Sequence, residues 1–158
     1  MERLRDVSEA ALLARLAPLY AAAQQAATTA VPVPAGDDAA VVSSPSGSVV
    51  ATVDSMVRGT DWRDDWSSAH DVGVKVAAQN LADLAAMGAV PTGLLVSLAA
   101  DPETPVEWAL GLAAGIASLA EQAGAAVVGG DLSSAPPGVV VVSVTALGDL
   151  GGRDPVLR

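Results

Sequence analysis

The chain has 158 residues, of which 51% are apolar, and a formal net charge of −10 from 18 acidic and 8 basic side chains. This length suits one domain with a core of its own. The acidic balance argues against nucleic acid as a partner, and the lack of cysteine excludes disulfides and thiolate metal sites. No apolar run approaches the ~20 residues that cross a bilayer, and the N-terminus lacks a signal-peptide core. We therefore expect a cytoplasmic protein without membrane contact.

The N-terminal third predicts a helix followed by a β-hairpin. Residues 6–27 form a helical pattern with Asp6 as the N-cap of a capping box, and Pro18 should kink or divide this helix. Two β-branched apolar runs, 39–43 and 48–54, flank a Ser-Pro-Ser-Gly turn. Apolar runs on either side of turn residues are typical of a hairpin.

A loop and a second helix should follow. Residues 57–68 combine glycine, two tryptophans and several charges, which predicts an irregular loop able to close over a ligand. Ser67 or Ser68 can cap a helix that runs to Met87 and stops at Gly88.

The C-terminal half alternates strands with one more helix. Residues 93–99 predict a strand, and a capping box at Thr104 opens a helix that ends near Gln122. A short strand, 125–128, leads into a Gly-Gly-Asp sequence, and 138–147 is the longest apolar run. The predicted order is α-β-β-α-β-α-β-β.

These elements predict a single domain, 1–158, of the α/β class, built as an α+β sandwich. We expect a mixed sheet of four or five strands with helices on one face. The strands at 94–98 and 139–142 are apolar on both faces, and three helices can cover only one of them. An apolar sheet face left open calls for a partner, so we expect a homodimer that forms through the sheet.

Four short polar segments are out of place among these apolar elements: Gly36-Asp37-Asp38, Thr52-Val53-Asp54, Asn80-Leu81-Ala82-Asp83 and Gly129-Gly130-Asp131. Each taken alone also fits a turn or a solvent-facing helix stripe. Two carboxylates ~4 Å apart repel by roughly 4 kcal/mol at an effective dielectric constant of 20, so converging carboxylates need cations. Mg²⁺ prefers such oxygen ligands, and a site with several Mg²⁺ ions is typical of phosphoryl transfer. Spacing alone does not establish that the segments converge.

Other chemistries have less support. Lys75 follows Gly-Val rather than a glycine-rich loop, so there is no Walker A motif. A single histidine, His70, cannot build a zinc site, and no nucleophile–base pair is evident.

Four segments closely resemble, in order, the signatures of thiamine-monophosphate kinases: Pro34–Val42, Thr52–Gly59, Asp71–Gly88 and Val128–Asp131. The resemblance covers about residues 10–158, and the Asn-Leu-Ala-Asp-Leu-Ala-Ala-Met-Gly block is its most specific part. It implies transfer of the γ-phosphoryl group of ATP to thiamine monophosphate, giving thiamine diphosphate. It also implies a nucleotide-binding domain of the aminoimidazole-ribonucleotide-synthetase type that dimerises through its sheets.

The resemblance further implies a set of Mg²⁺ ligands, namely Asp38, Thr52, Asp54, Asp83 and Asp131. It implies that Gly130 and Asp131 line the phosphates of ATP and that Arg158 contacts ATP. Where the family commonly has a histidine that meets the thiamine phosphate, this chain has Asp61, to which we assign a minor role in substrate contact.

The sequence stops at Arg158, whereas the family continues into a C-terminal domain that holds most of the thiamine pocket. We expect an N-terminal half that folds and dimerises but turns over poorly. Two alternatives remain. One is another ATP-dependent member of the superfamily, although selenophosphate synthetases usually carry a Cys or Sec that this chain lacks. The other is a dimerising module that binds metal or nucleotide without catalysis.

Overall fold

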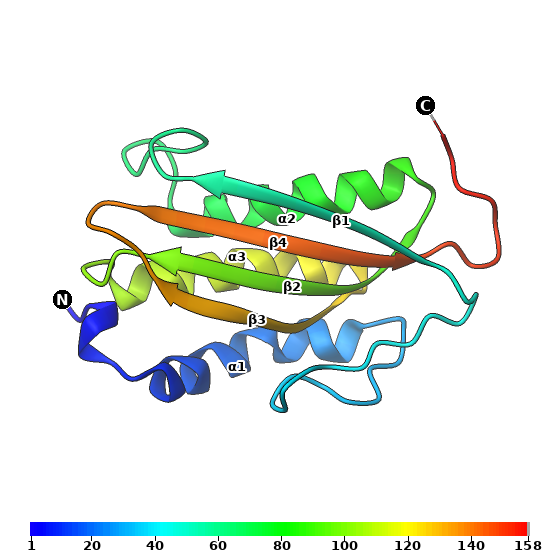
Figure 1. The fold of residues 1–158 in the computed structure, drawn as a ribbon, viewed down its shortest axis with the longest axis horizontal. Coiled ribbons are helices and arrows are strands. Elements are labelled where there is room, and N and C mark those ends of the chain that lie inside the picture. The colour runs from blue at the N-terminus through cyan, green and yellow to red at the C-terminus, as the bar shows by residue number, and fades with distance from the viewer. Residues whose placement is uncertain (158) are drawn as a thin grey trace.

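The computed structural model describes residues 1–157, and Arg158 lies outside the described part. Figure 1 shows one twisted sheet in front of the helices. Over the described range the elements are η1 (Leu4–Asp6), α1 (Glu9–Ala26), β1 (Val49–Val57), α2 (Ala69–Ala86), β2 (Val90–Ala100), α3 (Val106–Ala123), β3 (Ala126–Ser134) and β4 (Val140–Asp149).

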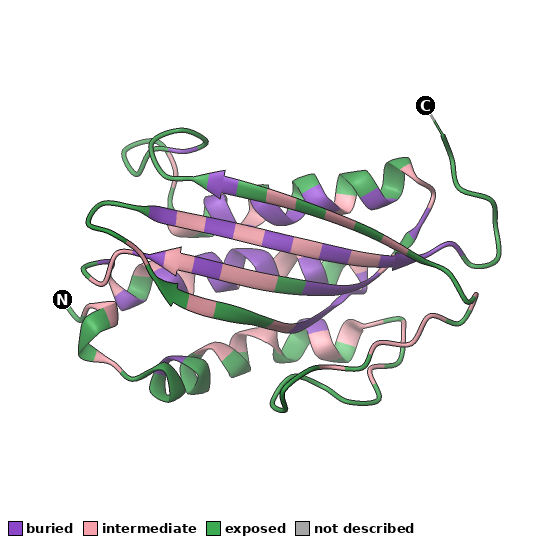
Figure 2. Cartoon of the chain, viewed as in Figure 1, coloured by how far each residue is buried: buried purple, intermediate pink, exposed green. Residues whose placement is uncertain are grey.

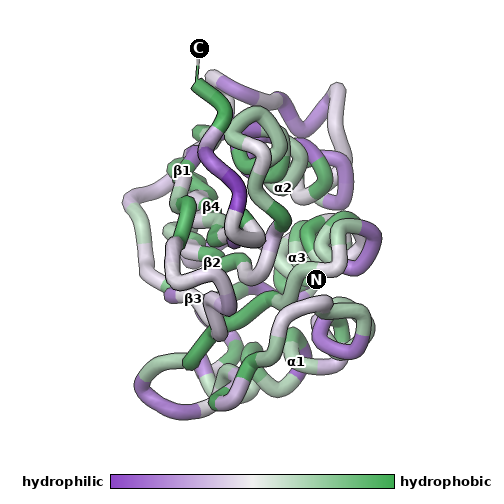
Figure 3. The backbone as a smooth tube through the Cα atoms, turned by 90° about the vertical axis from the view of Figure 1, so that its right-hand side faces the viewer, coloured by the Kyte–Doolittle hydropathy of each residue, from purple (hydrophilic) through white to green (hydrophobic). Residues whose placement is uncertain are grey.

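The strands form a mixed sheet in the order β1-β4-β2-β3. The central strand β4 is antiparallel to β1 and to β2, whereas β2 and β3 are parallel. Helix α3 makes the crossover that a parallel pair requires. The side view in Figure 3 places α1, α2 and α3 on one side of the four strands. The predicted mixed sheet with helices on one face is therefore confirmed.

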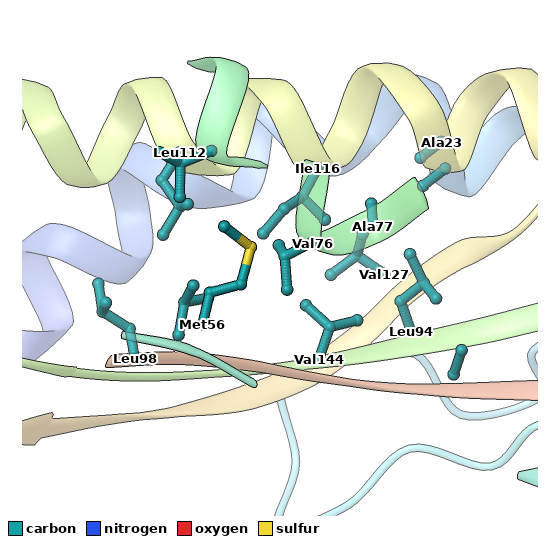
Figure 4. Close-up of a cluster of buried hydrophobic side chains, with 14 of the residues drawn as sticks. Ala23, Met56, Val76, Ala77, Leu94, Leu98, Leu112, Ile116, Val127 and Val144 are labelled. Carbon is teal, nitrogen blue, oxygen red and sulfur yellow. The ribbon is translucent and has the colours of Figure 1, made fainter. Parts of the chain in front are cut away.

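The core lies between the sheet and the helices. Along β4, Val140, Val142 and Val144 are buried and alternate with half-buried residues, which produces the stripes visible in Figure 2. Figure 4 shows Val144 on the sheet side of this core and Leu112 and Ile116 on α3 opposite it. With small Val, Leu and Ala side chains, the helices can approach the sheet and each other closely.

Helices α2 and α3 are in contact through glycines. A Cβ atom on Gly73 would lie 2.1 Å from the carbonyl oxygen of Leu112, and one on Gly115 would lie 2.1 Å from that of His70. No side chain fits at such distances, so these two glycines set how near the helices pack. No sequence motif marks these two glycines.

The predicted N-terminal hairpin is wrong. Residues 39–43 form only an isolated bridge between Val41 and Val33, and the second run becomes the nine-residue strand β1. β1 pairs instead with β4, in continuous antiparallel register from Val49 with Asp149 to Val57 with Val141. A long apolar strand offers more backbone hydrogen bonds than the short, proline-flanked run beside the turn.

Two predicted helix starts also differ. The N-cap of α1 is Ser8, whose Oγ accepts from the backbone N–H of Ala11, whereas Asp6 accepts from Arg3 in the preceding 3₁₀ turn. Helix α3 is preceded by Pro105 as N-cap, and Thr104 is buried with its hydroxyl unpaired among the described residues. The predicted N-terminal cap of α2 is confirmed at Ser68, which in addition forms a capping box with Asp71.

Candidate nucleotide and metal site

Strand β1 and helix α2 meet through a polar contact. The Oγ1 hydroxyl of Thr52 donates a hydrogen bond to Oδ2 of Asp83 at 2.9 Å. Side chains alternate along a strand, so Asp54 lies on the same, helix-facing side of β1 as Thr52. Two carboxylates and a hydroxyl thus share one edge of the sheet, and these are hard oxygen donors that suit Mg²⁺.

Asn80 holds this edge in place from the buried side. It is 0% exposed, its Nδ2 donates to the carbonyl oxygen of Val76 at 2.8 Å, and its Oδ1 accepts from the backbone N–H of Asp54 at 3.2 Å. Both ends of the amide are therefore occupied. Asn80 does not share an outward stripe with Asp83; it positions the backbone that carries Asp54.

The Gly-Gly-Asp segment lies inside β3 rather than after it, because β3 runs on to Ser134. Gly129 has φ 154°, and a Cβ on Gly130 would lie 1.8 Å from the carbonyl oxygen of Val96, next to the bulge where the β2–β3 register shifts. The backbone therefore requires glycine here. Oδ2 of the exposed Asp131 accepts from Oγ of Ser133 at 2.7 Å.

Asp54 and Asp131 lie near opposite edges of the sheet. The register places Asp54 opposite Val144, Val144 opposite Val96, and Val96 opposite Gly130. Three strand intervals of about 4.8 Å give roughly 14 Å between the β1 and β3 backbones, which is too far for one Mg²⁺ with ligand distances of about 2.1 Å. Among residues 1–157, no three His, Asp or Glu side chains lie close enough together to hold a metal ion.

The first polar segment lies beside the fourth. Asp38 is exposed, and its backbone N–H donates to Oδ1 of Asp37 in the loop before β1. Ala35 and Gly36 of this loop line the same cavity as residues 129–131. The structure therefore brings the four segments together as two pairs, one at the β1–α2 edge and one at the β3 edge.

The cavity at the β3 edge has a volume of about 350 Å³ and lies between α1, α3 and β3. Its walls are mostly apolar, with leucines from α1 and α3. Tyr20 and Gln24 of α1 are among its polar lining residues, and burial raises the pKa of the Tyr20 hydroxyl to about 12. A cleft of this size with few polar groups suits a small organic ligand. No motif in the sequence of α1 marks it as part of a site.

The remaining predicted contacts lie elsewhere. Oδ2 of Asp61 accepts from the backbone N–H of Val57 at 2.7 Å and so closes the turn after β1. The buried Trp62 beside it stacks on Trp108 with ring centroids 5.9 Å apart, which is a packing role. The predicted ATP contact Arg158 lies outside the described residues.

This fold and its polar edges define a class of protein. Residues 36–150 match the family model of AIR synthase related protein, N-terminal domain, and the chain belongs to this family. No helix within residues 1–157 combines the length and apolar character needed to cross a membrane.

Within that class the chain is similar to thiamine-monophosphate kinases, as the sequence motifs predicted. It is 50% identical over 123 residues to the enzyme of Mycobacterium tuberculosis, covering 78% of this chain and 36% of that one. The crystal structure of thiamine-monophosphate kinase from Stenotrophomonas maltophilia matches with a TM-score of 0.70 and 33% identity, over 90% of this chain and 42% of that one.

The solved complex of AaThiL with AMPPCP and TMP matches with a TM-score of 0.62 and 27% identity, over 71% of this chain and 35% of that one. The chain thus spans about a third of the length of the curated relatives it matches.

Proposed function

We propose that this chain is the ATP- and Mg²⁺-binding domain of a cytoplasmic kinase that phosphorylates thiamine monophosphate to thiamine diphosphate. The observation that carries the proposal is the pairing of an apolar cavity with a glycine-lined strand at one edge of the sheet. The likeness of the chain to kinases named for this reaction, and to one solved with AMPPCP and TMP, supports the same assignment.

The β3 edge is assigned to the nucleotide. The apolar cavity between α1 and β3 takes the adenosine part, and residues 129–131, which line the same cavity, face the phosphates. Asp131, and Asp38 two residues after the cavity-lining Gly36, supply exposed carboxylates at this edge. Burial of the base and exposure of the phosphates match the polarity of a nucleotide.

The β1 edge is assigned to metal binding through Thr52, Asp54 and Asp83. Mg²⁺, when bound, neutralises charge on the transferring phosphoryl group and aligns its oxygens. The protein's own part is positional: Asn80 fixes the backbone of Asp54, and the Thr52–Asp83 hydrogen bond holds strand and helix together. We assign Asp61 only a minor contact with thiamine monophosphate.

A second copy of the chain is proposed to join the two edges. The sheet face turned away from the helices exposes apolar side chains, among them Val53 at 59% and Leu95 at 38%. If two such faces pack about a two-fold axis parallel to the strands, β1 of each copy lies over β3 of the other. The β1 edge of one chain and the β3 edge of its partner would then lie about one sheet spacing, ~10 Å, apart.

Calorimetric titration with AMPPCP tests the proposal. We expect saturable binding in the presence of Mg²⁺ and its loss when EDTA removes the metal. This test concerns binding of a nucleotide and not selection of its base, so it does not depend on whether GTP competes with AMPPCP. A chain that folds and yet shows no heat of binding with Mg²⁺·AMPPCP would refute the assignment.

A further inference from the structure

A glutamine of α1 reaches into the cavity at the β3 edge. We propose that Gln24 recognises the base, with its Oε1 accepting a hydrogen bond from the exocyclic amine of adenine. The cleft would then select adenine over guanine nucleotides. This inference rests on the proposed nucleotide site and adds a residue that determines its specificity.

The orientation of the Gln24 amide is determined by one contact. Its Nε2 donates to the carbonyl oxygen of Val127 at 2.8 Å. A carbonyl oxygen only accepts, so the amide nitrogen must face Val127 and the amide oxygen must point away from it. Within residues 1–157 this is the hydrogen bond that the Gln24 side chain makes, so Oε1 keeps its acceptor capacity for a ligand.

The hydrogen bond is possible because β3 is an edge strand. β3 pairs with β2 on one side only, which leaves the Val127 carbonyl available to α1. Gln24 is half-buried and belongs to the cavity lining, whereas the next residue, Gln25, is exposed and does not. The sequence places two glutamines side by side, and the helix turns only one of them to the cavity.

Gln24 lies at the end of the cavity where a base would bind. This end is closed by Val127, which lines the cavity beside Gln24 and is 2% exposed. The opposite end is open, since Leu13 is 51% exposed. An apolar ring gains most from the closed end, and charged phosphates stay hydrated toward the open one.

The two purines differ at the atom that an acceptor would meet. Adenine carries an amine at position 6, which donates, whereas guanine carries an oxygen there, which accepts. Oε1 therefore forms a hydrogen bond with the amine of adenine. Facing guanine, it would meet the lone pair of another acceptor oxygen, which is repulsive. One such hydrogen bond is worth up to about a tenfold difference in affinity.

The test compares Gln24→Lys with Gln25→Lys. The lysine at position 24 keeps a donor for Val127 but replaces the acceptor with a second donor, and the control adds the same charge at an exposed neighbour. Dissociation constants for Mg²⁺·AMPPCP and its guanosine counterpart, β,γ-methylene-GTP, are measured by calorimetry. Because the added charge attracts both triphosphates alike, the ratio of the two constants isolates recognition of the base.

We expect the unmodified chain and Gln25→Lys to prefer the adenine nucleotide, and Gln24→Lys to lose about tenfold of that preference. Gln24→Leu, which removes donor and acceptor alike, should lose it as well, and thermal melting shows whether each variant is folded. If both Gln24 variants bind nucleotide with an unchanged ratio, Gln24 does not read the base. If the unmodified chain binds neither nucleotide, the proposed nucleotide site itself fails, and this inference with it.

Discussion

The hydroxyl of Thr52 and the carboxylate of Asp83 are 2.9 Å apart, although 31 positions separate them in the chain. One belongs to the edge strand β1 and the other to the exposed side of α2. Their contact ties two of the four polar segments into one oxygen-rich edge. The other two segments lie across the sheet, so the polar residues of one chain form two separate groups, which are the two proposed half-sites.

Replacement of Asp83 by Asn tests the first half-site. The variant should bind Mg²⁺·AMPPCP about tenfold or more weakly, because a neutral amide oxygen is a poor substitute for a carboxylate ligand. The fold should be little affected, since the amide oxygen can still accept from Thr52. Calorimetry with and without Mg²⁺ measures the first effect, and urea unfolding measures the second.

The matched control for charge is Glu121→Gln, at an exposed position near the end of α3. It removes the same formal charge away from both half-sites and should leave the affinity unchanged. Equal affinities in Asp83→Asn and in the unmodified chain would count heavily against the assignment of Asp83 as a metal ligand.

The contact between α2 and α3 predicts a strong effect of Gly73→Ala. Alanine is the better helix former by roughly 1 kcal/mol, but its Cβ would lie 2.1 Å from the carbonyl oxygen of Leu112. We expect the clash to prevail and the free energy of unfolding to fall by about 1–3 kcal/mol. Urea denaturation measures it. The exposed Ala82→Gly on the same helix should cost about 1 kcal/mol from propensity alone. Stabilisation by Gly73→Ala would show that the helices are further apart.

The hydrogen bonds to the Asp149 carboxylate predict how the stability of the fold depends on pH. The backbone N–H of Ser46, the backbone N–H of Gly151 and the hydroxyl of Ser44 all donate to its carboxylate, and they lower its pKa to about 2. A carboxylate with a depressed pKa in the folded state stabilises that state above the unfolded pKa of about 3.9. That contribution should be lost as the pH falls from about 4 to about 2.

Unfolding by urea at several pH values between 5 and 2 measures this dependence. Asp149→Asn should flatten the curve over that interval and should lower stability at pH 5. The exposed Asp154→Asn serves as the control and should leave the slope as it is. The same slope in Asp149→Asn would show that other groups produce the acid sensitivity.

The open face of the sheet predicts the effect of Val53→Lys. Val53 is 59% exposed in the middle of β1, on the face turned away from α2. A lysine there would place a charge in the proposed interface, so the chain should sediment as a monomer. Val156→Lys is the control, because Val156 is equally exposed, at 57%, but lies beyond β4. A monomeric parent chain, or a dimeric Val53→Lys variant, would contradict the proposed sheet interface.

Local signals predicted the helices best. Ser68 and Asp71 form the capping box of α2, and Gly124 ends α3 with a φ of 67°. A cap involves residues three or four positions apart, so its energetics are contained in the sequence around it. The hairpin prediction failed for the converse reason, since the partner of β1 is almost a hundred positions away and outcompetes the neighbouring run.

The candidate site was predicted only as a set of residues. Their polarity among apolar neighbours, and the motifs that carry the family resemblance, are properties of the sequence itself. The cavity beside α1 was missed, because Gln24 and Tyr20 stand in an Ala-rich helix without a motif.

Composition, periodicity and local motifs therefore determined the type of fold, the approximate extent of the helices and the kinship of this protein, because each depends on residues close together in the sequence. The order of the strands in the sheet decided where the polar segments lie relative to one another. With β1 and β3 at opposite edges, Asp54 and Asp131 are held roughly three strand spacings apart. That separation follows from hydrogen-bonded pairing between segments far apart in the chain, which no local sequence signal contains.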